Sequence, residues 1–246
     1  MKRKQWDDKR VYASFHDVPP RDYMYFPKGT LEISRPGKFS KIEIQHLLIS
    51  MFVLTIAFAF AFTDNNLMSG STNGFNFDIL PRGLLFSLLG IVTAFFFHEL
   101  SHKFMAQKYG LWAEYRMFPQ GLLLALMLGI LTPIVFAAPG AVMFRGESRS
   151  FETGKIAMAG PLANIVIALI AFPIFLVMLS EDTIFWQIAG FICFINAFLA
   201  FFNLLPFGPL DGTKIIRWDA TVWIIMLIIS TSVLITIWPR LPSILN

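Results

Sequence analysis

The sequence Phe97-His98-Glu99-Leu100-Ser101-His102 places two imidazoles four residues apart, with a carboxylate directly after the first. On a helix, residues i and i+4 lie on one face, so His98 and His102 can bind one metal ion together. Glu99 is rotated away from that face and can act on a water molecule instead of binding the metal. Neutral imidazole suits zinc, and a catalytic zinc site keeps a fourth position open. The pattern therefore predicts a zinc site with Glu99 beside it.

The motif follows an apolar run, residues 84–97, that is interrupted by the hydroxyls of Ser87 and Thr93. A helix made of this run and the motif is long enough to span a bilayer. Ionisable residues in a membrane helix are costly and usually functional, which argues against a chance occurrence of the pattern. We therefore expect the metal site near one end of a membrane-spanning helix.

The composition is that of a membrane protein with several spans. Of 246 residues, 56% are hydrophobic and 15% are charged, and the mean hydropathy is +0.63. A soluble domain would carry about 25% charged residues. The net charge of +4 comes from loops and the N-terminal region, where lipid headgroups and topology explain it without nucleic-acid binding. Cys193 is the one cysteine, so no internal disulfide can form.

The apolar segments predict an all-α polytopic membrane protein with five spans, at about 42–62, 83–109, 155–179, 183–205 and 221–238. With five crossings, nearly every Lys and Arg falls on the cytosolic side, and Arg82 and Arg240 are the exceptions. Residues 1–40 are polar and basic and predict a cytosolic N-terminal tail without a cleaved signal peptide. A prokaryotic cell membrane is the simplest expected location.

A further apolar stretch, residues 121–138, could be a sixth span or a segment that enters and leaves on the same side. Arg116 precedes it and Arg145 and Arg149 follow it, so both flanks have the basic character of the cytosolic side. A full crossing would also put all later residues on the opposite side from His98. We therefore expect a re-entrant segment, with a short helix near 121–131 and partly extended chain over 134–144.

A catalytic zinc ion needs a third protein ligand, and Asp211 is the best candidate. It follows a predicted span, so it lies at a depth similar to that of His98 on the same side of the membrane. Proline and glycine residues at 206, 208, 209 and 212 end that helix and allow the chain to turn the carboxylate inward. The alternative is an aspartate that caps a helix at an ordinary turn.

Three elements together resemble the signature of the site-2 protease family of intramembrane zinc metalloproteases. They are the His98–His102 motif, the run Gly160-Pro161-Leu162-Ala163-Asn164, and the run from Asn203 to Gly212. The resemblance covers about residues 83–218, within a membrane-embedded metalloprotease domain over 41–246. It implies one zinc ion per chain, bound by His98, His102 and Asp211.

The resemblance also implies that Glu99 is the general base and that Asn203 stabilises the reacting carbonyl or positions the substrate. The implied reaction is hydrolysis of peptide bonds within or near the transmembrane segments of membrane-protein substrates. The segment after the zinc helix resembles a membrane-embedded strand that pairs with unwound substrate. This chain departs from the family in its long apolar insert, in Thr213 in place of a second glycine, and in having no inserted PDZ-like domain.

Three other functions remain open. A metal or ion transporter would suit intramembrane His and Asp, but it predicts two internally similar halves, which are not evident. A different type of zinc protease would use a glutamate as its third ligand, and Glu147 and Glu152 lie in a loop. An inactive, protease-like binding protein would typically have lost Glu99. The substrate, the trigger for cleavage and the oligomeric state cannot be predicted.

Four polar residues of the apolar segments have simpler expected roles. Asn164 and Asn196 are expected to form hydrogen bonds between helices, Asn164 near the zinc helix. Ser101 and Thr93 are expected to bond to carbonyls of their own helix.

Overall fold

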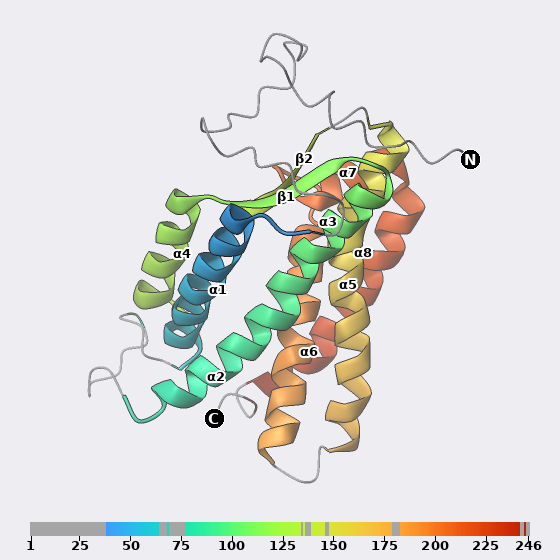
Figure 1. Ribbon diagram of the computed structural model, residues 1–246. Coiled ribbons are helices and arrows are strands. Elements are labelled where there is room, and N and C mark those ends of the chain that lie inside the picture. The colour runs from blue at the N-terminus through green and yellow to red at the C-terminus, as the bar shows by residue number, and fades with distance from the viewer. Residues whose placement is uncertain are drawn as a thin grey trace.

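The axes of the long helices are roughly aligned with one another, and a small sheet lies at one end of the molecule (Figure 1). This computed structural model describes residues 38–63, 68, 77–133, 135, 139–145, 148–178, 183–241 and 244. The predicted tail is therefore described only from residue 38, and the predicted outer turn at 181–182 lies outside the described residues.

Among the described residues, five helices are long and apolar enough to cross a membrane: Lys41–Phe62, Leu80–Lys108, Ser150–Val177, Ile184–Asn203 and Ala220–Arg240. They correspond to α1 (Lys41–Phe62), α2 with α3 (Leu80–Ile91 and Phe97–Lys108), α5 (Ser150–Val177), α6 (Ile184–Asn203), and α8 (Ala220–Ile237) with the short η3 (Trp238–Arg240). The five predicted spans are confirmed, and the protein is an all-α polytopic membrane protein.

The second span is interrupted by a π-helix, η2 (Val92–Phe96), just before the metal motif. Thr93 donates to the carbonyl of Leu89, and Ser101 donates to that of Phe97, so both hydroxyls are bonded within their own helix as expected. The span ends where Gly110 adopts φ +80° and the chain turns into the sheet.

The sheet has two antiparallel strands, β1 (Trp112–Met117) and β2 (Gly140–Arg145), with Tyr115 opposite Val142. Helix α4 (Pro119–Leu131) lies between them in sequence. Its 13 residues span only about 20 Å, less than a bilayer core. Because the segment starts and ends in one sheet, the re-entrant prediction is correct. Strand β2 agrees with the extended chain expected over 134–144, of which residues 134 and 136–138 lie outside the described part. Strand β1 was not predicted.

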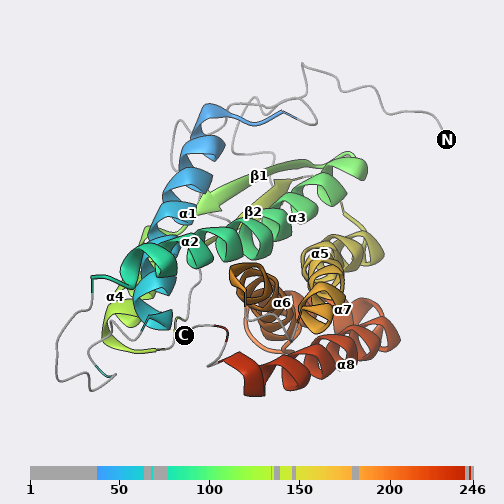
Figure 2. The same cartoon turned by 90° about the horizontal axis from the view of Figure 1, so that it is seen from below.

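Helix α4 packs along α1 on one side of the molecule, and a glycine allows the close approach (Figure 1). A Cβ atom at Gly129 would lie 2.2 Å from the main-chain oxygen of Ala57. The long α2–α3 span lies between this layer and the helices α5 and α6, and α8 covers their far side (Figure 2). Helix α7 (Asp211–Trp218), which was not predicted, packs against α5 and α8.

The re-entrant fold makes a topological prediction. Single cysteines at Lys108 and Ser148, which are exposed on either side of the β1–α4–β2 segment, should react with an impermeant maleimide from the same face of a sealed vesicle. A cysteine at Ile184, at the start of α6, should react from the opposite face. The native Cys193 is buried and gives a low background. Labelling of 108 and 148 from opposite faces would contradict the fold.

Candidate metal centre

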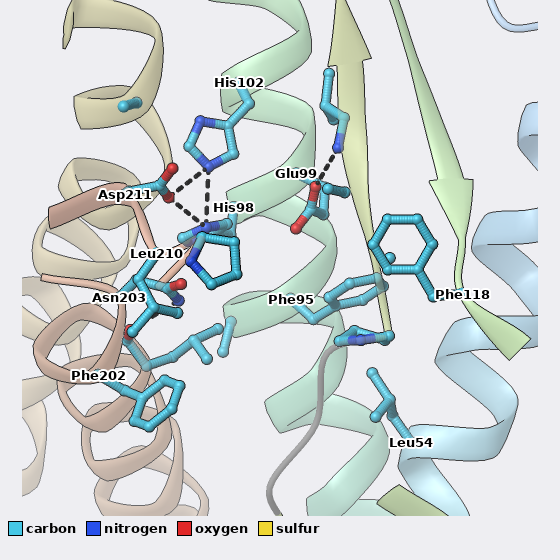
Figure 3. Close-up of a pocket in the computed structure, with 18 of the residues that line it drawn as sticks. Leu54, Phe95, His98, Glu99, His102, Phe118, Phe202, Asn203, Leu210 and Asp211 are labelled. Carbon is cyan, nitrogen blue, oxygen red and sulfur yellow. Dashed lines mark hydrogen bonds and ion pairs between the residues drawn. The ribbon is translucent and has the colours of Figure 1, made fainter. Parts of the chain in front are cut away.

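The two histidines of α3 point toward each other and away from the sheet (Figure 3). Both side chains are buried, and their Nε2 atoms lie 3.0 Å apart. This arrangement follows from the helix, because residues four apart lie one above the other on one face.

Asp211 joins the pair from the start of α7, as the sequence predicted. Its Oδ2 lies 3.0 Å from His102 Nε2 and 3.5 Å from His98 Nε2. The turn before it bends at Gly208, which has φ +62°. A Cβ at Gly212 would lie 2.2 Å from the carbonyl oxygen of Leu204, so a glycine lets α7 start against the end of α6. His98, His102 and Asp211 form the one potential metal-binding group found among the described residues.

The second nitrogen of each imidazole has a partner that fixes the tautomer. His102 Nδ1 lies 2.7 Å from the carbonyl oxygen of Ile156, which can only accept a hydrogen bond. His98 Nδ1 lies 2.7 Å from Asn164 Oδ1, which accepts in the same way. Both rings therefore carry their hydrogen on Nδ1 and direct an Nε2 lone pair at the other ring and at the carboxylate.

Three electron-rich atoms that face one another need a cation between them. Zinc bonds of about 2.0–2.1 Å in tetrahedral geometry separate neighbouring ligand atoms by about 3.3 Å. The separations among His98, His102 and Asp211 are 3.0, 3.0 and 3.5 Å, so the residues present fit a zinc ion. Two imidazoles and one carboxylate leave one of four positions for another ligand.

Gly160 of α5 gives these imidazoles their space. A Cβ on Gly160 would lie 2.3 Å from His102 Nε2 and 2.7 Å from His98 Cε1. The glycine therefore lets α5 cross α3 directly over the ligand atoms.

Asp211 is held as a carboxylate by its surroundings. Burial alone would raise its pKa, and the ammonium of Lys214 opposes this by favouring the ionised form. Lys214 Nζ lies 3.3 Å from Oδ1, and the imidazoles face Oδ2. The two carboxylate oxygens thus have different partners, and only Oδ2 faces the histidines.

Glu99 lines the same cavity as the ligand residues, on the side of α3 next to β2 (Figure 3). Its Oε2 accepts a hydrogen bond of 3.1 Å from the main-chain nitrogen of Val142. The position agrees with the prediction that Glu99 does not bind the metal. The cavity has a volume of about 310 Å³, and its mostly apolar walls come from α1, the second span, β2 and α6.

Asn203, at the end of α6, also lines this cavity, below Asp211 (Figure 3). Its Nδ2 donates to the carbonyl of Leu199 at 3.1 Å, and the amide has a second hydrogen to offer. The alternative ligand Glu152 instead accepts a hydrogen bond from the main-chain nitrogen of Arg149 at 2.8 Å, which caps α5. Glu147 lies outside the described residues.

Three groups that contribute to the site were not predicted from the sequence. They are the carbonyl of Ile156, the main-chain nitrogen of Val142 and the ammonium of Lys214. The two main-chain groups have no sequence signal. Lys214 could have been found, because it follows Asp211 by three residues at the start of a helix.

Comparison with known proteins gives three relatives that share the name "Putative zinc metalloprotease". MJ0611 of Methanocaldococcus jannaschii is 39% identical over 191 residues, which is 77% of this chain and 91% of that protein. YwhC of Bacillus subtilis is 29% identical over 160 residues, or 56% of this chain and 70% of that protein. Rip3 of Mycobacterium tuberculosis is 25% identical over 177 residues, which is 70% of this chain but 39% of that protein. No family model and no solved structure matches the chain significantly.

Replacement of Gly160 by alanine should abolish tight zinc binding, because the new methyl group would occupy the space of the two imidazoles. Bound zinc, measured by atomic absorption on the purified protein, should fall from about one per chain to well below half. Leu162→Ala, on the exposed side of the same helix, is the matched control and should retain zinc. Full zinc content in Gly160→Ala would rule out this packing of α5 on the site.

Proposed function

The chain belongs to the site-2 protease family of zinc metalloproteases, and we propose that it hydrolyses peptide bonds within or near the transmembrane segments of membrane proteins. The observation that carries the proposal is the convergence of His98, His102 and Asp211 at a cavity that Glu99 also lines. The five apolar spans make it an integral membrane protein in contact with lipid.

In the proposed site, His98, His102 and Asp211 hold the zinc ion. When bound, zinc would supply Lewis acidity, which makes water a nucleophile near neutral pH. Glu99 takes up a proton from water and later delivers it to the amine that leaves. The hydrogen bond from Val142 holds Oε2 of Glu99 and so orients the carboxylate toward the cavity. The free hydrogen of the Asn203 amide stabilises the developing negative charge on the carbonyl oxygen, a contribution of about 3 kcal/mol.

The sheet supports binding of an extended substrate at one particular edge. On β1, the main-chain nitrogens of Tyr115 and Met117 donate to Glu43 and His46 of α1, at 3.1 and 3.4 Å. Helix α1 therefore covers the outer edge of β1. The outer edge of β2 faces the cavity instead, since Gly140, Val142 and Phe144 all line it. A substrate strand that pairs with β2 would lie between Glu99 and the zinc ligands.

The topology that we propose puts the metal centre at the cytosolic end of the spans, together with the tail at 1–40. Water can reach the cavity from that side through the region of Lys214, which is partly exposed. Peptide bonds in a substrate helix are protected by hydrogen bonds within the helix, so the substrate must unwind before it pairs with β2. Selectivity would then depend on the stability of the substrate helix.

The other candidates have less support. A transporter would need a pathway through two related halves, and the described helices show no such repeat. An inactive binding protein would have no need of a carboxylate held in the cavity beside the metal ligands. The protease is therefore the function that the geometry supports best.

The Glu99→Gln variant should bind zinc like the parent protein but cleave a single-span substrate at least about 100-fold more slowly, because glutamine cannot carry the proton. Zinc content and cleavage in detergent are measured on the same preparations. Equal cleavage by both proteins would contradict the proposed mechanism.

The Asp211→Ala variant should lose about 100-fold or more in zinc affinity, because a ligand is removed. The matched variant Asp219→Ala removes a nearby carboxylate that caps α8 and should bind zinc normally. Unchanged affinity in Asp211→Ala would assign the third ligand elsewhere.

Proline at Val142 should lower the cleavage rate by at least about tenfold, because it removes the N–H that orients Glu99 and alters the edge offered to substrate. Zinc content should not change, since Val142 contacts no ligand atom. Val142→Ala keeps the N–H and should cleave at nearly the parental rate. If Val142→Pro retains zinc and cleaves normally, the β2 edge has no role in catalysis.

A further inference from the structure

A chain of buried polar side chains leads away from the metal centre into the membrane-spanning helices. Asn164 of α5 and Asn196 of α6 are both fully buried, and Thr93 lies in the π-helix η2. Asn164 Nδ2 donates to Asn196 Oδ1 at 3.2 Å, and Asn196 Nδ2 donates to Thr93 Oγ1 at 3.1 Å. Asn164 also contacts the metal centre, because its Oδ1 lies 2.7 Å from His98 Nδ1. We refer to Asn164, Asn196 and Thr93 as the polar relay.

Main-chain carbonyls fix the direction of every bond in the polar relay. Asn164 Nδ2 donates to Ala94 O at 3.0 Å, Asn196 Nδ2 donates to Ile192 O at 2.9 Å, and Thr93 Oγ1 donates to Leu89 O at 2.8 Å. A carbonyl oxygen can only accept, so neither amide can be reversed without loss of these bonds. Since the hydroxyl of Thr93 donates to its own helix, it must accept from Asn196.

The last hydrogen bond of this series is made to His98, one of the proposed zinc ligands. Both hydrogens of the Asn164 amide nitrogen are used, one on Ala94 and one on Asn196, so its oxygen faces His98 Nδ1. The oxygen can only accept, which leaves the lone pair of His98 on Nε2, toward His102 and Asp211. A reversed Asn164 amide would place an N–H against Nδ1 and favour the tautomer that cannot bind the metal through Nε2.

The π-helix explains how the polar relay reaches this histidine. Ala94 lies within η2, where the wider turn rearranges the main-chain hydrogen bonds just before His98. Its carbonyl is thereby offered to the side chain of Asn164 on the neighbouring helix. The π-helix and the polar relay thus act on the same residue.

We propose that Asn196 and Thr93 are positioning residues of the metal centre, which hold the Asn164 amide in the one orientation that presents His98 Nε2 to the metal. The proposal rests on the assignment of His98 as a zinc ligand under the proposed function. It goes further, because it assigns an effect on zinc affinity to two residues of the transmembrane core: Asn196, which bonds to Asn164, and Thr93, which bonds to Asn196. If they only join helices, they should affect stability alone.

The test measures the zinc dissociation constant of the full-length protein in detergent, by competition with a chromogenic chelator. Asn164→Leu should weaken zinc binding about 10- to 100-fold, which is the usual effect of removing the hydrogen-bond partner of a histidine that binds a metal. Asn196→Leu and the isosteric Thr93→Val should each weaken it about 3- to 10-fold. Thr93→Ser keeps the hydroxyl and should bind within about twofold of the parent. The control is Ser230→Ala, which removes a buried hydroxyl from α8 that bonds within its own helix.

A double variant shows whether Asn196 acts through Asn164. If it does, Asn164→Leu combined with Asn196→Leu should bind zinc as weakly as Asn164→Leu alone, within about twofold. Additive losses of affinity would overturn the proposal, because Asn196 would then act independently. Thermal stability is measured on the same samples, and lower stability with parental zinc affinity in Asn196→Leu and Thr93→Val would also overturn it.

The zinc measurement separates this proposal from the proposed function. If the variants change zinc affinity as expected but the parent protein cleaves no single-span substrate, the polar relay is supported and the protease function is not. A parent protein that binds no zinc overturns the polar relay as a device of the metal centre. Because Thr93→Val removes no volume, it keeps the test decisive even if Asn196→Leu does not fold.

Discussion

The structure depends on a repulsion that only a cation can relieve. Two imidazole lone pairs and a carboxylate oxygen face one another at 3.0 to 3.5 Å in a buried site. Each ligand is held in place by another part of the protein. Asn164 contacts His98, the carbonyl of Ile156 contacts His102, and the turn before α7 places Asp211. Without a positive charge between them, these atoms would cost free energy in a medium of low polarity. The packing of α3, α5 and α7 at this point is therefore explained by the binding of a metal ion.

Close packing of main chain brings these ligands together from distant parts of the sequence. Gly160 lets α5 cross directly over the two imidazoles, and Gly212 lets α7 begin against the end of α6. Neither contact could be made by a residue with a side chain, because a Cβ would lie within 2.3 Å of its neighbour in both cases. Small residues are favoured where membrane helices meet for the same reason. The glycine positions thus determine the geometry of the metal centre as much as the ligands do.

The parts of the site with local signals could be predicted from the sequence, and the rest could not. His98, His102 and Glu99 follow from helical periodicity, and Asp211 follows from charge topology and its turn. The charges that flank 121–138 also predict the re-entrant path correctly. Strand β1 was missed because its pairing with β2 depends on residues more than twenty positions away. Asn164 and Asn196 were expected to join helices, but that they bond to each other and to Ala94 depends on packing that no local pattern encodes.

Helix α3 carries two pairs of residues with the same four-residue spacing, one on each of two neighbouring faces, and the two pairs have different roles. His98 and His102 lie four residues apart and face α5 and Asp211, and Glu99 and Lys103 lie four residues apart on the next face. Lys103 forms a buried ion pair with Glu43, whose other oxygen accepts from the main chain of β1. Its neighbour on that face, Glu99, accepts from the main chain of β2. The second face therefore fixes the sheet and α1 relative to the helix, and the first face fixes the metal ligands. Because both faces belong to one rigid helix, the distance from the outer edge of β2 to the metal centre is set by the helix itself.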